Sequence, residues 1–118
     1  MGIFRVRIEV GDPQGSRFED VDALVDTGAS HSAAPASLLR RLGIEPYQTA
    51  SFQLADGRLI DLEIGQTWVR VDGEQAITQV VFAEEGTQPL LGAVTLEQLG
   101  LGIDPIRRRL IPVPRLLM

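Results

Sequence analysis

One short segment of this chain carries residue types that could do chemistry. Two apolar residues, Leu24 and Val25, are followed directly by Asp26, Thr27 and Gly28. A carboxyl group at the end of a buried strand is costly unless it has a partner, so Asp26 is a candidate for general acid–base chemistry. Gly28 permits a tight turn with its backbone N–H near the carboxylate, and the Thr27 hydroxyl can fix that turn. The segment therefore predicts a rigid cradle for one carboxyl group.

Other chemistries find less support in the residue types. Ser30, His31 and Ser32 are consecutive, but adjacent residues rarely form the hydrogen bond that a Ser–His hydrolase needs, and there is no Gly-x-Ser-x-Gly turn. We therefore expect His31 to be an exposed or capping residue. With one His and no Cys, the chain lacks a multi-histidine or thiolate site, so we expect no metal and no other cofactor.

Composition and charge limit the remaining classes of function. The 118 residues include 11 basic and 16 acidic side chains, which gives a net charge of −5. This acidic balance argues against general affinity for nucleic acid or for an anionic membrane. No apolar run approaches the length of a membrane span, and the N-terminal residues alternate charged with apolar types, unlike a signal peptide. We expect a single domain over residues 1–118, soluble and cytoplasmic.

Short strands and two short helices must position the Asp26 segment. Period-two alternation of apolar residues and turn signals predict strands at 4–10, 17–25, the arms of a hairpin over 52–62, 67–71, 75–83 and the tail at 103–113. Helices are expected over 35–42 and 94–99, each stopped by a glycine. The turn spacing predicts a mostly β chain that forms a closed or partly closed barrel.

The Asp26-Thr27-Gly28 tripeptide resembles the catalytic signature of aspartic proteases. Ala29, Ser30 and the helix expected over 35–42 are similar to the retroviral-type, single-domain branch, the retropepsin-like proteases. A tripeptide alone is weak evidence, because it can arise by chance. The plain alternative is a turn that ends a strand, since Asp and Gly are ordinary turn residues.

Two further features stand in the order that this family requires. The first sequence mark of the family is the Asp-Thr-Gly tripeptide, and the second is a pair of apolar residues and a glycine before a short helix. Leu90-Leu91-Gly92 and the helix expected at 94–99 resemble this second mark. Between the two marks the family has a β-hairpin flap, and the hairpin over 52–62 lies in that interval. The closing segment at 99–113 is similar to bacterial and archaeal members. The resemblance implies an acid-protease β-barrel with two short helices and a flap.

The resemblance implies an aspartic endopeptidase, in which two carboxyl groups activate one water to hydrolyse a peptide bond. This chain has one Asp-Thr-Gly and is too short for a second lobe, so the second Asp26 should come from an identical chain across a two-fold axis. Thr27 would grip the partner's backbone. The terminal strands at 4–10 and 110–117 are candidates for an intermolecular sheet. Ala93 stands where viral enzymes have a dimer-binding Arg, so this homodimer must be held differently.

The resemblance also implies how a peptide substrate would bind. An extended peptide would lie between Asp26 and the flap, with Ala29 and Ser30 at the edge of the cleft and Leu91 in its wall. Ala29 lacks the hydroxyl that pepsin-like enzymes place beside the carboxylate, so we expect a less acidic working range than theirs. The candidate catalytic residues are Asp26, Thr27 and Gly28. The candidate substrate-binding residues are Ala29, Ser30, Ala55, Asp56, Gly57, Arg58, Leu91 and Gly92.

Three other functions fit parts of this sequence. The same fold could be a catalytically silent module for dimerisation or peptide binding, in which case replacing Asp26 would leave binding intact. A purely structural β-barrel subunit would keep the two Asp26 residues of its assembly far apart. A metal-dependent hydrolase is the least supported alternative, because the chain is poor in metal ligands.

Overall fold

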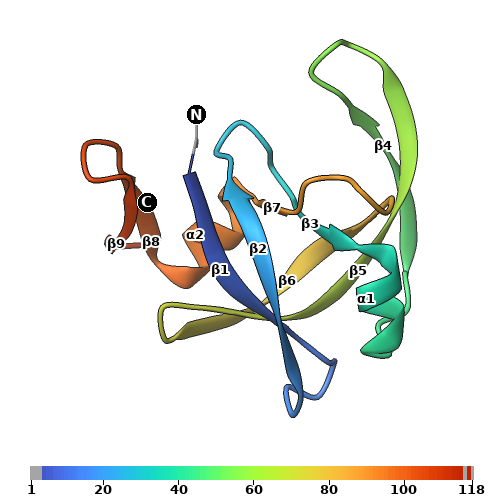
Figure 1. Cartoon of the computed structure of the whole chain (residues 1–118), viewed down its shortest axis with the longest axis horizontal. Coiled ribbons are helices and arrows are strands. Elements are labelled where there is room, and N and C mark those ends of the chain that lie inside the picture. Colours follow the sequence, from blue (N-terminus) through green and yellow to red (C-terminus); the bar gives the residue numbers. More distant parts are fainter. Residues whose placement is uncertain (1–3, 116, 118) are drawn as a thin grey trace.

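The computed structural model describes residues 4–115 and 117 (Figure 1). The strands are β1 (Phe4–Gly11), β2 (Phe18–Val25), β3 (Ser32–Pro35), β4 (Gln48–Gln53), β5 (Leu59–Val71), β6 (Glu74–Ala83), β7 (Leu90–Leu91), β8 (Leu101–Asp104) and β9 (Arg109–Pro112). The helices are α1 (Ala36–Arg41) and α2 (Ala93–Leu99). The expectation of a mostly β chain with two short helices is confirmed.

Seven of the strands form one sheet in the order β1-β2-β7-β3-β6-β5-β4. Strand β5 also pairs with β1, so the hydrogen-bonded neighbours from β1 to β5 form a ring and β4 extends beyond it. The pairs β2–β7 and β3–β6 are parallel, whereas the other pairs in this sheet are antiparallel. The parallel β2–β7 pair matters for function because it places the end of β2 beside the start of α2.

The predicted alternation explains the core. In β1 the side chains of Ile8 and Val10 are buried while Arg5 and Arg7 are exposed, as a strand with one inward face requires. Such inward residues join Leu39 of α1 and others in one apolar core. Each fully buried aliphatic side chain contributes about 1.5–3 kcal/mol to folding, so this core holds the frame on which the site is built.

Strand β5 differs from the sequence expectation. The return arm of the expected hairpin and the strand expected at 67–71 join into one continuous strand, which runs from Leu59 to Val71. A Cβ atom at Gly65 would lie 2.8 Å from a methyl group of Ile44 and 2.9 Å from the Phe82 ring. The glycine therefore allows close packing against the strand and does not mark a turn.

Two other segments were predicted incompletely. Strand β3 was not expected, because its four residues, Ser32–Pro35, are small and show no alternation. The tail at 103–113 was expected to be one extended strand, but it turns back after Asp104, so that β8 and β9 form a separate hairpin. The expected intermolecular strand at 110–117 overlaps β9 only as far as Pro112, and its residue 116 lies outside the described residues.

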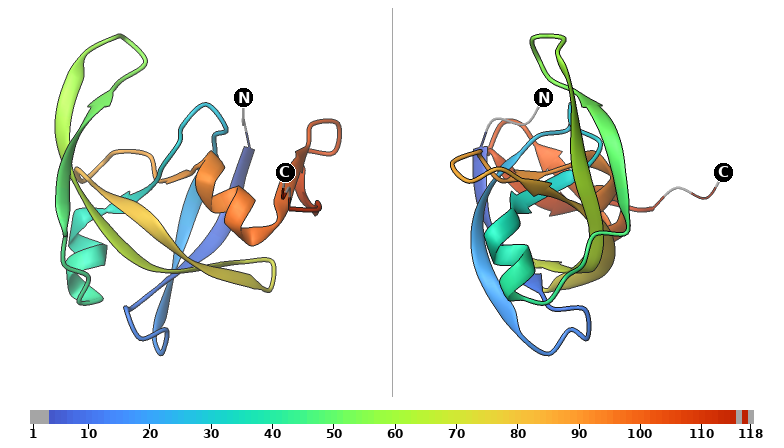
Figure 2. Two further views of the ribbon diagram at one scale, coloured as in Figure 1. Left: turned by 180° about the vertical axis from the view of Figure 1, so that it is seen from behind. Right: turned by 90° about the vertical axis from the view of Figure 1, so that its right-hand side faces the viewer.

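The β4–β5 hairpin and the loop that follows β2 project from the same side of the molecule, as both views in Figure 2 show. Helix α1 packs near the opposite end of the hairpin, beside β3 and β6. Among the described residues, neither helix is long and apolar enough to span a bilayer. The projecting hairpin and loop define the side on which the candidate site lies.

Candidate active site

Asp26 is the first residue after β2, and backbone contacts on both sides fix its position. Its N–H donates to the carbonyl of Leu91 at 3.1 Å, which continues the parallel β2–β7 pairing by one residue. Its carbonyl accepts the N–H of Ala29 at 3.2 Å, which closes a tight turn. The carboxylate oxygen Oδ1 accepts the N–H of Gly28 at 2.9 Å. This is the contact that the tripeptide predicts.

Asp26 as a residue is half-buried, whereas Thr27 and Gly28 are exposed. Within residues 4–115 and 117, no hydrogen bond engages its second oxygen, Oδ2. One oxygen is thus held by the protein, and the other can meet a water, a substrate group or a group from another chain. A carboxyl group in this setting can act as one half of an acid–base pair.

The loop at 26–31 crosses the start of α2 at very short range. A Cβ atom at Gly92 would lie 2.5 Å from the carbonyl oxygen of His31, so only glycine fits there. The first two N–H groups of α2 donate to the loop: Ala93 to the Ala29 carbonyl at 2.9 Å, and Val94 to the Ser30 carbonyl at 3.2 Å. These bonds satisfy N–H groups that a helix start otherwise leaves unpaired. The two sequence marks, which begin 90 − 26 = 64 residues apart, are therefore joined in the structure.

A chain of three buried hydroxyl groups lies beneath this crossing. The Oγ of Ser32 accepts the N–H of Gly92 at 3.0 Å and lies 2.6 Å from the Oγ1 of Thr95. Thr95 in turn lies 2.9 Å from the Oγ1 of Thr78 on β6. Sequence reasoning missed this network, because the available signal is weak: hydroxyl residues at positions where the pattern of a strand or helix faces inward.

A cleft of about 790 Å³ lies between residues 28–31, the β4–β5 hairpin and the loop before β7. Its apolar lining coincides with a second hydrophobic cluster, separate from the main core: Ala33, Ala50, Phe52, Leu62, Ile64, Val81, Ala83 and Leu90. Three of these are alanines, which leaves open space beside an apolar wall. Such a cleft suits an apolar side chain of an extended chain.

The expected substrate-binding residues are distributed unevenly around this cleft. Ala29, Ser30 and Arg58 line it, together with the catalytic candidate Gly28. Leu91 is completely buried in the main core, and its neighbour Leu90 lines the cleft instead. Ala55, Asp56 and Gly57 are exposed at the hairpin tip, outside the lining, and Gly92 is buried behind the crossing.

The hairpin tip is tied together by polar contacts. The Arg58 guanidinium donates to the Asp56 carboxylate at 2.8 Å, and the Arg58 N–H donates to the same carboxylate at 3.0 Å. These hydrogen bonds, first from the backbone N–H and then from the side chain, hold the pKa of Asp56 below its ordinary value. The tip therefore carries a charged pair that is salt-sensitive because both groups are exposed.

The surroundings of His31 differ from the exposed or capping position that the sequence predicts. Its Nδ1 lies 2.8 Å from the Oγ of Ser30, so a hydrogen bond that adjacent residues rarely form is present here. The ring is half-buried in the cleft wall and meets the Phe52 ring edge-on at 5.3 Å. In the described part of the chain no carboxylate hydrogen-bonds this ring, so the third group of a Ser–His–Asp arrangement is missing. Nor do three or more His or acidic side chains of that part gather as a metal site.

Comparisons with known proteins agree with this geometry. A family model described as gag-polyprotein putative aspartyl protease matches residues 17–98, which include both sequence marks and the hairpin between them. No curated protein sequence is a significant match. The fold is similar to the solution structure of Simian Foamy Virus (mac) protease, with a TM-score of 0.56 and 18% identity over 79% of this chain and 91% of that chain.

A second solved structure has the same fold. It is the retroviral protease-like domain of Ddi1 from Leishmania major, with a TM-score of 0.58 and 19% identity over 95% of this chain and 89% of that chain. At this level of identity both structures support the fold, while the family model supports the family. The chain therefore belongs to the gag-polyprotein putative aspartyl protease family and has a retropepsin-like fold.

Proposed function

We propose that this protein is an aspartic endopeptidase, active as a homodimer whose two Asp26 carboxyl groups face each other across the two-fold axis. The observation that carries the proposal is the Asp26 carboxylate, held through Oδ1 by the Gly28 N–H and open at Oδ2, in a turn whose residues Gly28 and Ala29 line the cleft. Two such groups share one proton. One accepts a proton from the attacking water while the other donates to the scissile carbonyl.

The surface around Thr27 supports a second copy as the partner. Thr27 is exposed and borders a hollow of about 380 Å³ whose other walls come from α2, β8 and Pro105. Val94, at the start of α2, is 43% exposed, and Ile106, in the β8–β9 turn, is 90% exposed. Apolar side chains beside a hollow favour burial against another protein surface. In this proposal Thr27 contacts the partner's backbone, and the face replaces the contact that Ala93 does not provide.

The β4–β5 hairpin is the proposed flap, and the ring of strands is the proposed acid-protease barrel. The hairpin forms one wall of the cleft through Phe52, Leu54 and Arg58, so its movement would open or cover a peptide bound there. Such a peptide would lie extended between the 28–31 segment and the hairpin, with apolar side chains against the alanine-lined wall.

Cleavage of a diverse peptide mixture tests the proposal, between about pH 4 and pH 7 and at high protein concentration. Asp26→Asn keeps the size of the side chain and an oxygen for the Gly28 N–H, but it removes the acid. Asp20→Asn is the matched control, because Asp20 lies on β2, the strand that leads to Asp26, and makes an exposed ion pair with Arg7. Wild type and the control should cleave, the Asp26 variant should not, and a chelator should change nothing. Cleavage by Asp26→Asn would refute the mechanism.

A peptide-binding module without catalysis is the second candidate. The observation that favours it is that Asp26 is not part of the cleft lining, so the cleft can hold a peptide whether or not the carboxylate reacts. This candidate predicts equal peptide affinity for wild type and Asp26→Asn, with no cleavage by either. Binding measured by isothermal titration calorimetry on both proteins separates the two functions.

A further inference from the structure

The cleft has one wall that the catalytic proposal does not explain. This wall is the 84–89 loop between β6 and β7, from which Glu84, Thr87 and Gln88 line the cleft. The loop is exposed over 84–87, and its internal bond, from the Thr87 N–H to the Glu84 carbonyl at 3.1 Å, does not tie it to the rest of the fold. Contacts with other elements of the fold must therefore fix the position of this loop.

The far end of the loop is anchored to β2. The carbonyl of Pro89 accepts the Leu24 N–H at 2.9 Å, and the Gln88 amide donates to the Asp22 carbonyl at 3.4 Å. The near end continues from β6. Over the middle of the loop, one side chain reaches another element within the described residues, and that side chain is Glu85.

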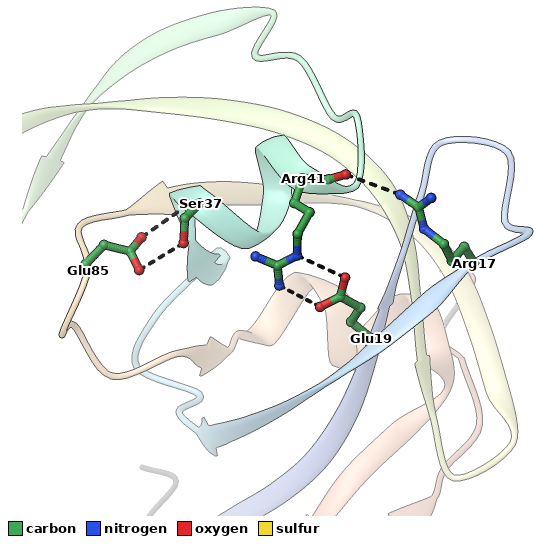
Figure 3. A network of polar contacts seen from close by, with 5 residues as sticks. All are labelled: Arg17, Glu19, Ser37, Arg41 and Glu85. Carbon is green, nitrogen blue, oxygen red and sulfur yellow. Dashed lines mark hydrogen bonds and ion pairs between the residues drawn. The ribbon is translucent and has the colours of Figure 1, made fainter.

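Glu85 holds the start of α1, as Figure 3 shows. Its Oε2 accepts the backbone N–H of Ser37 at 3.1 Å, and its Oε1 accepts the hydroxyl of Ser37 at 2.9 Å. Pro35, at the N-cap position of α1, supplies no side-chain hydrogen bond to the helix. The carboxylate of Glu85 thus caps α1 from outside the helix, with two charge-assisted hydrogen bonds to one residue.

Helix α1 is itself fixed, so it can act as an anchor. Leu38 and Leu39 are buried in the main core. At its other end, Arg41 makes two hydrogen bonds to Glu19 on β2, and its carbonyl accepts a hydrogen bond from Arg17. Figure 3 shows these contacts on the side of α1 away from Glu85.

We infer that Glu85 is a positioning residue. Its two hydrogen bonds to Ser37 hold the 84–89 loop against α1 and so set the width of the peptide-binding cleft. This inference rests on the proposed peptide-binding function. Glu85 itself lies outside the cleft lining, so it acts through Glu84, Thr87 and Gln88. Loss of these two hydrogen bonds should lower peptide affinity and selectivity without changing the Asp26 chemistry.

The test compares Glu85→Ala, which removes both acceptors, with Glu85→Gln, which keeps one carbonyl oxygen for Ser37. Ser37→Asp is an independent variant, because it places a negative charge against Glu85 while an acidic residue near a helix start is compatible with α1. Glu19→Ala is the matched control. It removes a glutamate that binds the same helix through Arg41 and that, within the described residues, makes no hydrogen bond to the 84–89 loop.

Amide hydrogen exchange is the first measurement, because it does not depend on catalysis or on a ligand. Exchange of the two hydrogen-bonded amides, at position 37 and at Thr87, should rise about fivefold or more in Glu85→Ala and Ser37→Asp, and much less in Glu85→Gln and Glu19→Ala, given two charge-assisted bonds lost or kept. Unchanged exchange in Glu85→Ala would show that the hydrogen bonds to Ser37 do not hold the loop.

Peptide affinity is the second measurement, made in the Asp26→Asn background so that no peptide is cleaved. The dissociation constant for a peptide cleaved by wild type should rise about three- to tenfold in Glu85→Ala, with kcat of the catalytically intact variant unchanged. Faster amide exchange in Glu85→Ala together with an unchanged peptide affinity would refute the positioning role. If wild type neither binds nor cleaves any peptide, the proposed function and the affinity effect both fail, and the exchange data still decide whether Glu85 holds the loop.

Discussion

Gly92→Ala is the substitution that tests most directly how the site is built. An ideal Cβ atom at this position lies 2.5 Å from the carbonyl oxygen of His31, 2.6 Å from its carbonyl carbon and 3.0 Å from the carbonyl oxygen of Ser30. All three are backbone atoms of the loop that carries Asp26, so no side chain can rotate away. The added methyl group must push the 26–31 loop away from the start of α2.

The size of the effect follows from these distances. To reach an ordinary contact of 3.4 Å, the His31 carbonyl must retreat by 3.4 − 2.5 = 0.9 Å. The hydrogen bonds from Ala93 to Ala29 and from Val94 to Ser30 then lengthen from 2.9 and 3.2 Å beyond useful range. Each is worth about 0.5–1.5 kcal/mol, and overpacking adds about 1–3 kcal/mol, so we expect a loss of about 3 kcal/mol.

Urea unfolding followed by the fluorescence of Trp68, the single tryptophan, measures this loss. Gly102→Ala is the matched control, because its Cβ atom would meet a methyl group of Val113 at 2.9 Å, and that half-exposed side chain can move aside. The control should lose less than about 1 kcal/mol, and the melting temperature of Gly92→Ala should fall by about 10 °C. Equal stability of the two variants would refute the steric argument.

Two further predictions concern buried and partly buried polar groups. Thr95→Val keeps the shape of the side chain but removes the hydroxyl that bonds to Ser32 and Thr78, so urea unfolding should show a loss of about 1–3 kcal/mol; an unchanged midpoint would contradict this. Asp12 has a pKa below its ordinary value, and the main cause is the hydrogen bond that its carboxylate accepts from the backbone N–H of Ser16. The ionised Asp12 therefore stabilises the fold fully above the unfolded pKa of about 3.9. This stabilisation is lost as the pH falls through the lower pKa of the folded state. The melting temperature of wild type should therefore fall more steeply below about pH 4 than that of Asp12→Ala, and parallel curves would count against the assignment.

The parts of the site that the sequence predicts well are those set by local chemistry. The Asp26 turn depends on residues within three positions of one another, and glycine at position 28 is enough to bring its N–H to the carboxylate. The hairpin tip at 55–58 follows in the same way from an Asp-Gly pair between apolar runs. Both predictions needed only short-range geometry, and both contacts are present.

The parts that the sequence does not predict depend on contacts between distant segments. The alternation places Gly65 in a strand, but only the positions of Ile44 and Phe82 show why that position of β5 needs a glycine. Leu90 and Leu91 are both apolar, but the pairing of β7 with β2 sends Leu91 into the core and leaves Leu90 in the cleft. In each case the sequence supplies the residue type, and the neighbour that gives it a role is far away in the chain.

The buried hydroxyls show how the site and the core depend on each other. Because β7 ends at Leu91 and α2 begins two residues later, the Gly92 N–H is buried at a place where neither the strand nor the helix supplies an acceptor. Ser32 supplies that acceptor, but a buried hydroxyl also needs partners of its own, which Thr95 and then Thr78 provide. The chain of hydrogen bonds that begins at the Gly92 N–H thus ends at Thr78 on β6, a strand that packs against α2. A substitution in the core at Thr78 should therefore disturb the Asp26 loop more than its distance along the chain suggests.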